Sequence, residues 1–215
     1  MAVSRSIAVV AMSTRNPGVG PSVTAFIHEK LQPAAVKASI TLDLVKLSDF
    51  NLPVFDESVI PAMVPAKASF SHSHSLKWSA EMKKHAGFVF VIPEYNFGMA
   101  GGTKNAIDYL MHEIKGKPAL VVSYGVQGGI SASEQMTHTL EGMGLKISKA
   151  KPQLGFRNGG QGPDLFETMK GTLPDTTKEL WEKEKVEDVL KGFGEVIDVL
   201  NEKEDGNGDK DEPKA

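Results

Sequence analysis

Apolar runs alternate with amphipathic segments along the whole chain. The apolar runs predict β-strands, and segments with apolar residues three and four positions apart predict α-helices. Strands are expected at residues 7–11, 40–47, 88–92, 119–122 and 147–151. Helices are expected at residues 22–31, 69–85, 103–113, 131–143 and 176–200. Because strand and helix alternate throughout, we expect a parallel sheet with helices on both faces.

The composition of the loops favours one strand order. The loops after the first, third and fourth strands are the richest in Gly, Pro, hydroxyl and aromatic residues. In the flavodoxin-like order 2-1-3-4-5 the ends of these three strands are neighbours, and ligands bind at this switch point. We therefore expect an α/β flavodoxin-like three-layer sandwich with a five-stranded parallel sheet and one crevice surrounded by three unusual loops.

One domain is expected over residues 1–200, since the chain of 215 residues is long enough to bury a substantial core. Residues 201–215 combine acids and Lys with Gly and Pro and lack an apolar anchor, so they are predicted to be a disordered acidic tail. Residues 48–68 form a long Pro-containing loop. A loop of this length is usually functional or packs on a partner.

The composition limits the chemistry. The chain has no cysteine, so disulfides, thiolate metal sites and cysteine nucleophiles are excluded. Redox chemistry would therefore have to come from a cofactor. A net charge of −3 gives no reason to expect nucleic acid or a membrane as partner. The apolar run at residues 7–12 is shorter than a signal-peptide core, and we expect a cytoplasmic protein.

The first loop suits a phosphate. Ser13, Thr14 and Arg15 supply hydroxyl and guanidinium groups directly before a predicted helix. The alternative interpretation is an ordinary connection with a surface arginine. Two known glycine-rich phosphate motifs are excluded, because Val23 and Thr103 stand where these motifs require glycine.

The other two loops suit a flat ligand. Residues 93–97 offer two aromatic rings, which can stack on a planar heterocycle. The alternative interpretation is a tight turn with Tyr95 and Phe97 packed in the core. Residues 123–129 contain three glycines, which allow backbone N–H groups to approach a ligand closely.

These segments resemble a known family. The string PEYNFGMAGGTKNAIDYL from Pro93, followed by KGKPALVVSYGVQGG from Lys115, is similar to the signature of the NADPH-dependent FMN reductases. This flavodoxin-like group includes quinone, azo-dye and chromate reductases, and the resemblance is closest to its fungal quinone reductase branch. The resemblance extends from Ser6 to about Ala150.

The resemblance implies a noncovalent FMN and either NADPH or NADH as electron donor. Ser13 and Arg15 match the family's phosphate-binding G-S-x-R turn, although Met12 stands where the family has glycine. The positions that match the family's cofactor-binding segments are Ser13, Thr14, Arg15, Pro93, Glu94, Tyr95, Asn96, Phe97, Ser123, Tyr124, Gly125 and Gly128.

The resemblance further implies a homodimer or homotetramer that transfers two electrons, as hydride, by a ping-pong scheme from NADPH to quinones or similar small-molecule acceptors. No catalytic side chain is predicted, because the cofactor carries the chemistry. No metal site is predicted either, since His72 and His74 lack a third ligand and are interpreted as a solvated segment. Two alternatives remain open: a flavin-binding redox sensor that docks a protein partner, and a flavodoxin-like electron carrier.

Overall fold

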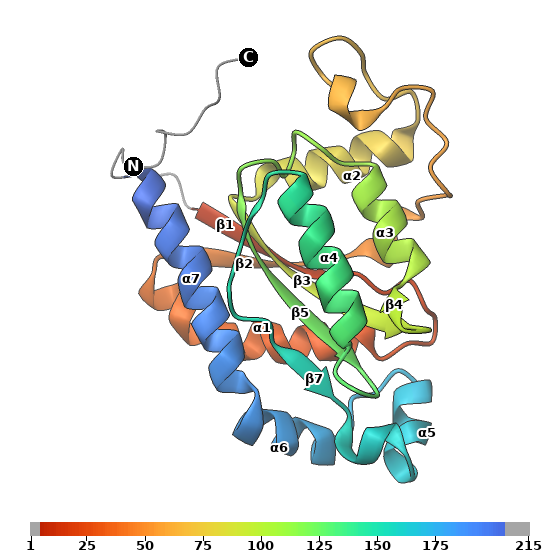
Figure 1. Ribbon diagram of the computed structural model, residues 1–215, viewed down its shortest axis with the longest axis vertical. Helices are drawn as coiled ribbons and strands as arrows, with labels where there is room; N and C mark the ends of the chain where they lie inside the picture. Colours follow the sequence, from red (N-terminus) through yellow and green to blue (C-terminus); the bar gives the residue numbers. More distant parts are fainter. Residues whose placement is uncertain (1–4, 205–215) are drawn as a thin grey trace.

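The computed structural model describes residues 5–204 and forms an α/β sandwich (Figure 1). Its strands are β1 (Arg5–Ala11), β2 (Ile40–Lys46), β3 (Gly87–Tyr95), β4 (Gly98–Met99), β5 (Pro118–Gly125), β6 (Lys146–Ile147) and β7 (Gln153–Gly155). Its α-helices are α1 (Gly20–Lys37), α2 (Ser73–Lys84), α3 (Gly101–Asp108), α4 (Ile130–Gly142), α5 (Pro163–Met169), α6 (Asp175–Glu184) and α7 (Val186–Glu204). Short 3-10 helices lie at Leu47–Phe50, Pro61–Met63 and Arg157–Gly160.

The sheet has the predicted flavodoxin-like order, which runs β2-β1-β3-β5-β6. All pairs along this path are parallel. The described sheet contains seven strands rather than five, because β4 adds an antiparallel hairpin arm to β3 and β7 adds a second short partner to β5. The loops after β1, β3 and β5 therefore leave the same edge of the sheet from neighbouring strands.

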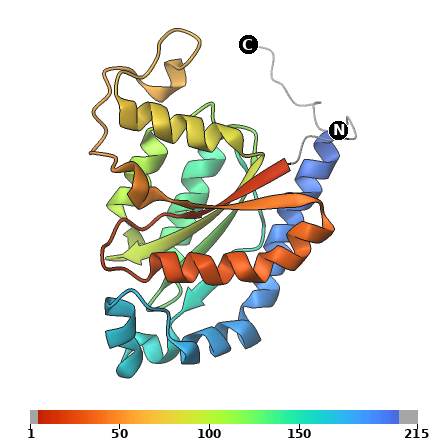
Figure 2. The same ribbon diagram turned by 180° about the vertical axis from the view of Figure 1, so that it is seen from behind.

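Alternating side chains of the central strands build two cores. Ile7 and Val9 of β1 face one core together with α1 and α7, whereas Ala8 and Val10 face the other together with α2, α3 and α4. Figures 1 and 2 show the sheet between these two helical layers. The continuous apolar runs of the sequence reflect this burial on both faces.

Helix α1 is longer than the predicted segment at residues 22–31, and it continues through Pro33 to Lys37. An internal proline removes one helical hydrogen bond and costs about 3 kcal/mol in isolation. Leu31 and Ala35 are fully buried on either side of Pro33. Packing of this face on the core keeps the helix continuous where local propensity predicts its end.

The C-terminal third differs most from expectation. Residues 152–174 were expected to be irregular, but they contain β7, the 3-10 helix Arg157–Gly160 and α5. The single predicted helix at residues 176–200 is two helices, α6 and α7, which meet at Lys185. Helix α7 continues past Leu200 to Glu204, and the remaining part of the predicted tail, residues 205–215, lies outside the described residues.

None of the helices within residues 5–204 combines the length and the apolar character needed to cross a lipid bilayer.

Candidate functional site

The loops after β1, β3 and β5 meet around one cavity of about 180 Å³. Each loop contributes side chains or backbone to its wall, and the segment after β7 closes the remaining side. The lining residues are Ser13, Arg15, Val19, Pro93, Glu94, Tyr95, Tyr124, Gly125, Val126, Phe156, Gly160, Leu165 and Thr168. The cavity thus lies at the switch point at which ligands bind in sheets of this order.

One end of this cavity is polar. The hydroxyl oxygens of Ser13 and Tyr95 lie 3.1 Å apart, and Ser13 also contacts the hydroxyl of Tyr124. The guanidinium of Arg15 donates to the carbonyl of Thr168 over 3.4 Å. Helix α1 begins just beyond, and its N-cap residue Val19 provides no side-chain cap. A guanidinium, hydroxyls and a helix N-terminus without a side-chain cap form a site that favours an anion.

The first turn of α1 approaches this polar end closely because residue 20 is glycine. A Cβ atom on Gly20 would lie 2.7 Å from the Cβ of Ser13 and 2.7 Å from the hydroxyl oxygen of Tyr124. Any other residue would push these groups apart. Gly20 therefore fixes the distance between the helix N-terminus and the two hydroxyls.

The phenol of Tyr124 stays protonated at neutral pH. Burial raises the pKa of Tyr124 above its ordinary value, and the neighbouring Tyr95 acts in the same direction. The hydroxyl is therefore a hydrogen-bond donor throughout the physiological range.

The third loop is shaped by glycines with left-handed backbone. Gly128 has φ +84° and Gly129 has φ +76°. Ser123 Oγ donates to the carbonyl of Gly128 over 2.7 Å. Ser123 is fully buried and supports the turn from within, so neither Ser123 nor Gly128 is part of the cavity wall.

The second loop is a tight hairpin rather than a simple break. Asn96 and Phe97 link β3 to β4 with φ +49° and φ +60°, as a two-residue hairpin turn requires. Phe97 is 80% exposed, so the interpretation that its ring packs in the core is wrong. Tyr95 faces the cavity, whereas Asn96 and Phe97 do not line it.

Glu94 has a second, structural contact. Its carboxylate accepts a hydrogen bond from the backbone N–H of Ala132 over 3.1 Å, in the first turn of α4. An anionic side chain at a helix N-terminus is electrostatically favourable. Glu94 thus ties the second loop to the helix that follows the third loop.

Thr14 is separated from the other predicted residues of the first loop. Together with Asn16 it lines a different cavity, of about 540 Å³, between the loop after β2 and the start of α3. The neighbouring Met12 has no positive φ, and its side chain is fully buried in the core beneath α2, α3 and α4. Side chains of the first loop therefore point alternately to two sides of the sheet.

Sequence reasoning missed the wall formed by Phe156, Gly160, Leu165 and Thr168. These residues lie in the segment that was expected to be irregular. The available signal was Pro163 at a favourable first helical position, followed by apolar residues at 165, 166 and 169. This signal predicts a short amphipathic helix, but nothing in it indicates that the helix reaches the cavity.

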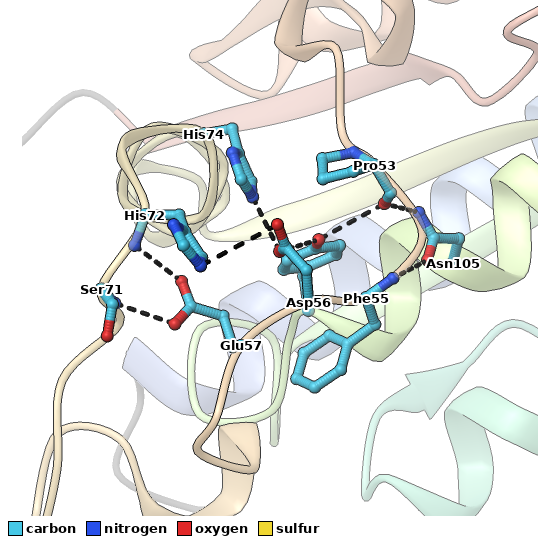
Figure 3. A network of polar contacts seen from close by, with 9 residues as sticks. Pro53, Phe55, Asp56, Glu57, Ser71, His72, His74 and Asn105 are labelled. Carbon is cyan, nitrogen blue, oxygen red and sulfur yellow. Dashed lines mark hydrogen bonds and ion pairs between the residues drawn. The ribbon is translucent and has the colours of Figure 1, made fainter.

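A second polar cluster ties the long loop after β2 to the rest of the protein (Figure 3). Asp56 Oδ1 lies 3.0 Å from His74 Nε2 and accepts a hydrogen bond from the hydroxyl of Tyr109 over 2.9 Å. His72 Nε2 lies 3.9 Å from the other oxygen of Asp56. The two histidines are thus engaged by a carboxylate rather than free in a solvated segment. Within residues 5–204, no cluster of three or more His, Cys, Asp or Glu side chains is suited to hold a metal ion.

Glu57 anchors the same loop to the start of α2. Its two carboxylate oxygens accept hydrogen bonds from the backbone N–H groups of Ser71 and His72, each over 2.9 Å. Burial alone would raise the pKa of Glu57, but these hydrogen bonds outweigh it and the pKa lies below its usual value. Burial and the bond to Asp56 raise the pKa of Tyr109 to about 12.

Comparison with known proteins gives consistent results. The sequence profile of the NADPH-dependent FMN reductases matches residues 5–158. An NAD(P)H-dependent FMN reductase of Nectria sp is 43% identical over 199 residues, which cover 91% of this chain and 97% of that protein. A quinone reductase of Escherichia coli K12 is 28% identical over 177 residues, which cover 78% of this chain and 82% of that protein.

Among solved structures, the FerB NAD(P)H:acceptor oxidoreductase of Paracoccus denitrificans has the same fold. The two structures superpose with a TM-score of 0.58 at 21% identity, over 92% of this chain and 98% of that one.

Proposed function

The chain belongs to the NADPH-dependent FMN reductase family, and on this premise we propose that it is an FMN-containing oxidoreductase that transfers two electrons, as hydride, from NAD(P)H to a quinone or similar small molecule. The observation that carries the proposal is the meeting of three loops around one cavity with a cationic, hydroxyl-rich end. The family relatives named as FMN reductases and quinone reductases support the same activity.

The residues present fit FMN in their chemistry. Arg15, Ser13 and the first turn of α1 would hold the phosphate, because together they supply charge-assisted and backbone donors. The glycine turn Gly125–Gly129 would let backbone N–H groups approach the edge of the ring. Tyr95 would lie beside the ring as an aromatic neighbour. When bound, FMN supplies a ring that can accept hydride from a nicotinamide and deliver two electrons to a second substrate.

The protein contributes position and electrostatics rather than an acid or base. Tyr124 keeps its proton on its hydroxyl oxygen and can therefore donate a hydrogen bond within the cavity as well as accept one. Glu94 is held by the start of α4, which fixes the second loop relative to the third. We assign no catalytic side chain, in agreement with chemistry that resides in the cofactor.

We further propose a ping-pong order, in which the nicotinamide leaves before the acceptor binds. The three loops surround one cavity, so the nicotinamide and the acceptor would use the same side of the bound FMN in turn. Initial rates measured against NADPH at several fixed menadione concentrations should give parallel reciprocal lines. Lines that intersect would contradict the ping-pong order.

We also propose that the protein forms a homodimer or homotetramer. Val54 and Ile60 on the long loop are strongly exposed, and Met63 is also exposed. Adjacent exposed apolar side chains often mark a protein interface. Sedimentation equilibrium of the full chain tests this proposal, and a monomer at micromolar concentration would contradict it.

The visible absorption spectrum tests the oxidoreductase proposal most directly. The protein, purified or reconstituted with FMN, should show flavin bands that bleach when NADPH is added without oxygen. The bands should return after addition of menadione. Flavin bands that NADPH leaves unchanged would contradict the proposed activity, and a protein that cannot take up FMN would contradict the cofactor assignment.

A further inference from the structure

Helix α5 carries a stripe of exposed apolar side chains that begins at the cavity wall. Leu165 lines the cavity and is 43% exposed. Met169 follows four positions later and is 57% exposed, and Phe166 is 64% exposed. Met169 lies four positions after Leu165 and three after Phe166, so it shares a helix face with each of them. The stripe therefore continues the cavity wall outward to the surface.

The cavity wall contains a second exposed apolar residue outside α5. Val126 of the third loop also lines the cavity and is 62% exposed. Within the cavity, Phe156 adds an aromatic ring to the same wall. Ser13 and Arg15 supply polar groups to the same cavity, and Arg15 contacts α5 through the carbonyl of Thr168. The wall of the cavity thus combines exposed apolar side chains with a few polar groups.

The position of α5 is defined by several contacts with the first loop and α1. Besides the bond from Arg15 to Thr168, Ser22 Oγ donates to the carbonyl of Gly171 over 2.7 Å. Asp164 accepts hydrogen bonds from the hydroxyls of Thr176 and Thr177, over 2.8 and 3.1 Å. These contacts fix α5 against the rest of the protein. The apolar stripe is therefore exposed although the helix is packed in place.

The family profile ends at residue 158, so α5 lies beyond the part of the chain that matches it. Large apolar side chains held in water carry a cost that burial against a ligand would remove. We propose that Leu165 and Phe166 select the electron acceptor, favouring planar apolar quinones over charged, hydrophilic acceptors. This inference rests on the proposed function, because it assigns the acceptor class of the same site.

The balanced reaction allows two kinds of acceptor to be compared. Menadione accepts two electrons and two protons, namely one hydride equivalent that originates from NADPH and one proton from solvent. Ferricyanide accepts one electron, so two ferricyanide ions oxidise one NADPH to NADP⁺ with release of one proton. A selective apolar wall should matter for menadione and should be irrelevant for the charged ion.

The experiment compares Leu165→Ser and Phe166→Ser with the unaltered FMN-loaded protein. The first readout needs no turnover: menadione is titrated into the oxidised protein, and quenching of tryptophan fluorescence gives its dissociation constant. Trp181 is a suitable reporter because its ring lies 5.7 Å from that of Phe156, between centroids. The second readout is the ratio of kcat/KM for menadione to that for ferricyanide.

Each substitution should weaken menadione binding by roughly five- to tenfold, as expected when a contact of a few methylene groups is lost. The kcat/KM ratio should fall by the same factor, with ferricyanide reduction unchanged. Val36→Ser is the matched control, since Val36 is 71% exposed at the far end of α1, on the opposite edge of the sheet.

Equal menadione binding in all four proteins would overturn the inference, as would an equal loss for both acceptors. Weakened FMN binding in the two α5 variants would also overturn it, because the stripe would then belong to the cofactor site. The exposed ring of Phe166 is not part of either core, so Phe166→Ser should leave the stability of the fold unchanged. A loss of menadione binding in this variant would therefore not be due to unfolding. If the unaltered protein binds FMN but fails to oxidise NADPH, the proposed function fails instead.

Discussion

The hydroxyl oxygens of Ser13 and Tyr95 lie 3.1 Å apart, although the two residues are 82 positions apart in the sequence. Ser13 follows β1 and Tyr95 ends β3, so this contact joins the two loops at the switch point of the sheet. Ser13 also contacts the hydroxyl of the buried Tyr124, which comes from β5. The hydroxyl of Ser13 thus connects the three strand ends that carry the loops of the candidate site.

Two substitutions of Tyr95 distinguish the contribution of its aromatic ring to FMN binding from that of its hydroxyl. Tyr95→Phe loses one hydrogen bond, worth about 0.5–1.5 kcal/mol, and should weaken FMN binding by up to about tenfold. Tyr95→Ala also loses the aromatic neighbour of the ring and should weaken binding further. Because Tyr95 is 39% exposed, both variants should keep a melting temperature near that of the unaltered protein. FMN fluorescence titration and thermal melts give both quantities, and loss of folding in Tyr95→Ala would indicate a packing role instead.

Arg15→Ala removes the only charged side chain contributed to the polar end by the first loop. A hydrogen bond to a charged group contributes about 1.5–3 kcal/mol. The dissociation constant for FMN should therefore rise by about tenfold or more, whereas riboflavin, which has no phosphate, should be affected little. Lys37→Ala is the control, since Lys37 lies in the last turn of α1. Unchanged FMN affinity in Arg15→Ala would contradict the assignment of the first loop.

The sequence predicted the sheet well because its strands are buried on both faces. The apolar runs in β1, β3 and β5 are short and rich in β-branched residues, a combination that favours strands buried on both faces. The order of the strands followed from the composition of the three loops. Pro93 has no N–H to donate to a neighbouring strand and therefore suggested that β3 ends before it. The strand nevertheless continues to Tyr95. Because β1 pairs with β3 only as far as Val91, Pro93 does not interrupt the pairing between β1 and β3.

The missed parts of the site depend on contacts between distant segments. Helix α5 reaches the cavity through Arg15 and Ser22, which bond to carbonyls more than a hundred residues later in the chain. No local pattern encodes such contacts. Likewise, the resemblance matched Thr14 to the first loop without indicating that its side chain points to the other side of the sheet. Sequence position places Thr14 in the first loop but does not give the direction of its side chain.

Glu57 should make the protein sensitive to acid. Its folded-state pKa is lowered, so its stabilising contribution is complete above the ordinary carboxylate pKa and is lost as the pH falls through the lowered value. Glu57→Gln should lower the melting temperature at pH 7 by about 2–4 °C, which corresponds to loss of about 1 kcal/mol. The difference between the two proteins should shrink as the pH approaches 3.

Glu179→Gln is the control for this prediction, because Glu179 is exposed on α6. Its melting temperature should match that of the unaltered protein across the same pH series. If the difference between Glu57→Gln and the unaltered protein were constant from pH 7 to pH 3, the loss would come from altered packing and not from the charge of Glu57.

Two glycines of α7 should respond in opposite ways to the same substitution. A Cβ atom on Gly192 would lie 2.5 Å from Leu120 Cδ1 and 3.1 Å from Ser148 Oγ, whereas no atom outside the helix lies within 4 Å of such a Cβ on Gly194. Leu120 is fully buried in β5 and has little freedom to move. Overpacking of this kind costs about 1–3 kcal/mol, while glycine to alanine in a helix gains about 0.5–1 kcal/mol.

Gly194→Ala should therefore stabilise the protein by the full helical gain, whereas Gly192→Ala should destabilise it despite that gain. Urea unfolding of both variants measures the difference, and each serves as the control for the other. Equal stabilisation in the two variants would mean that α7 does not pack against β5 as closely as Gly192 allows. The sequence pattern alone treats the two glycines as equivalent, and only the position of Leu120 distinguishes them.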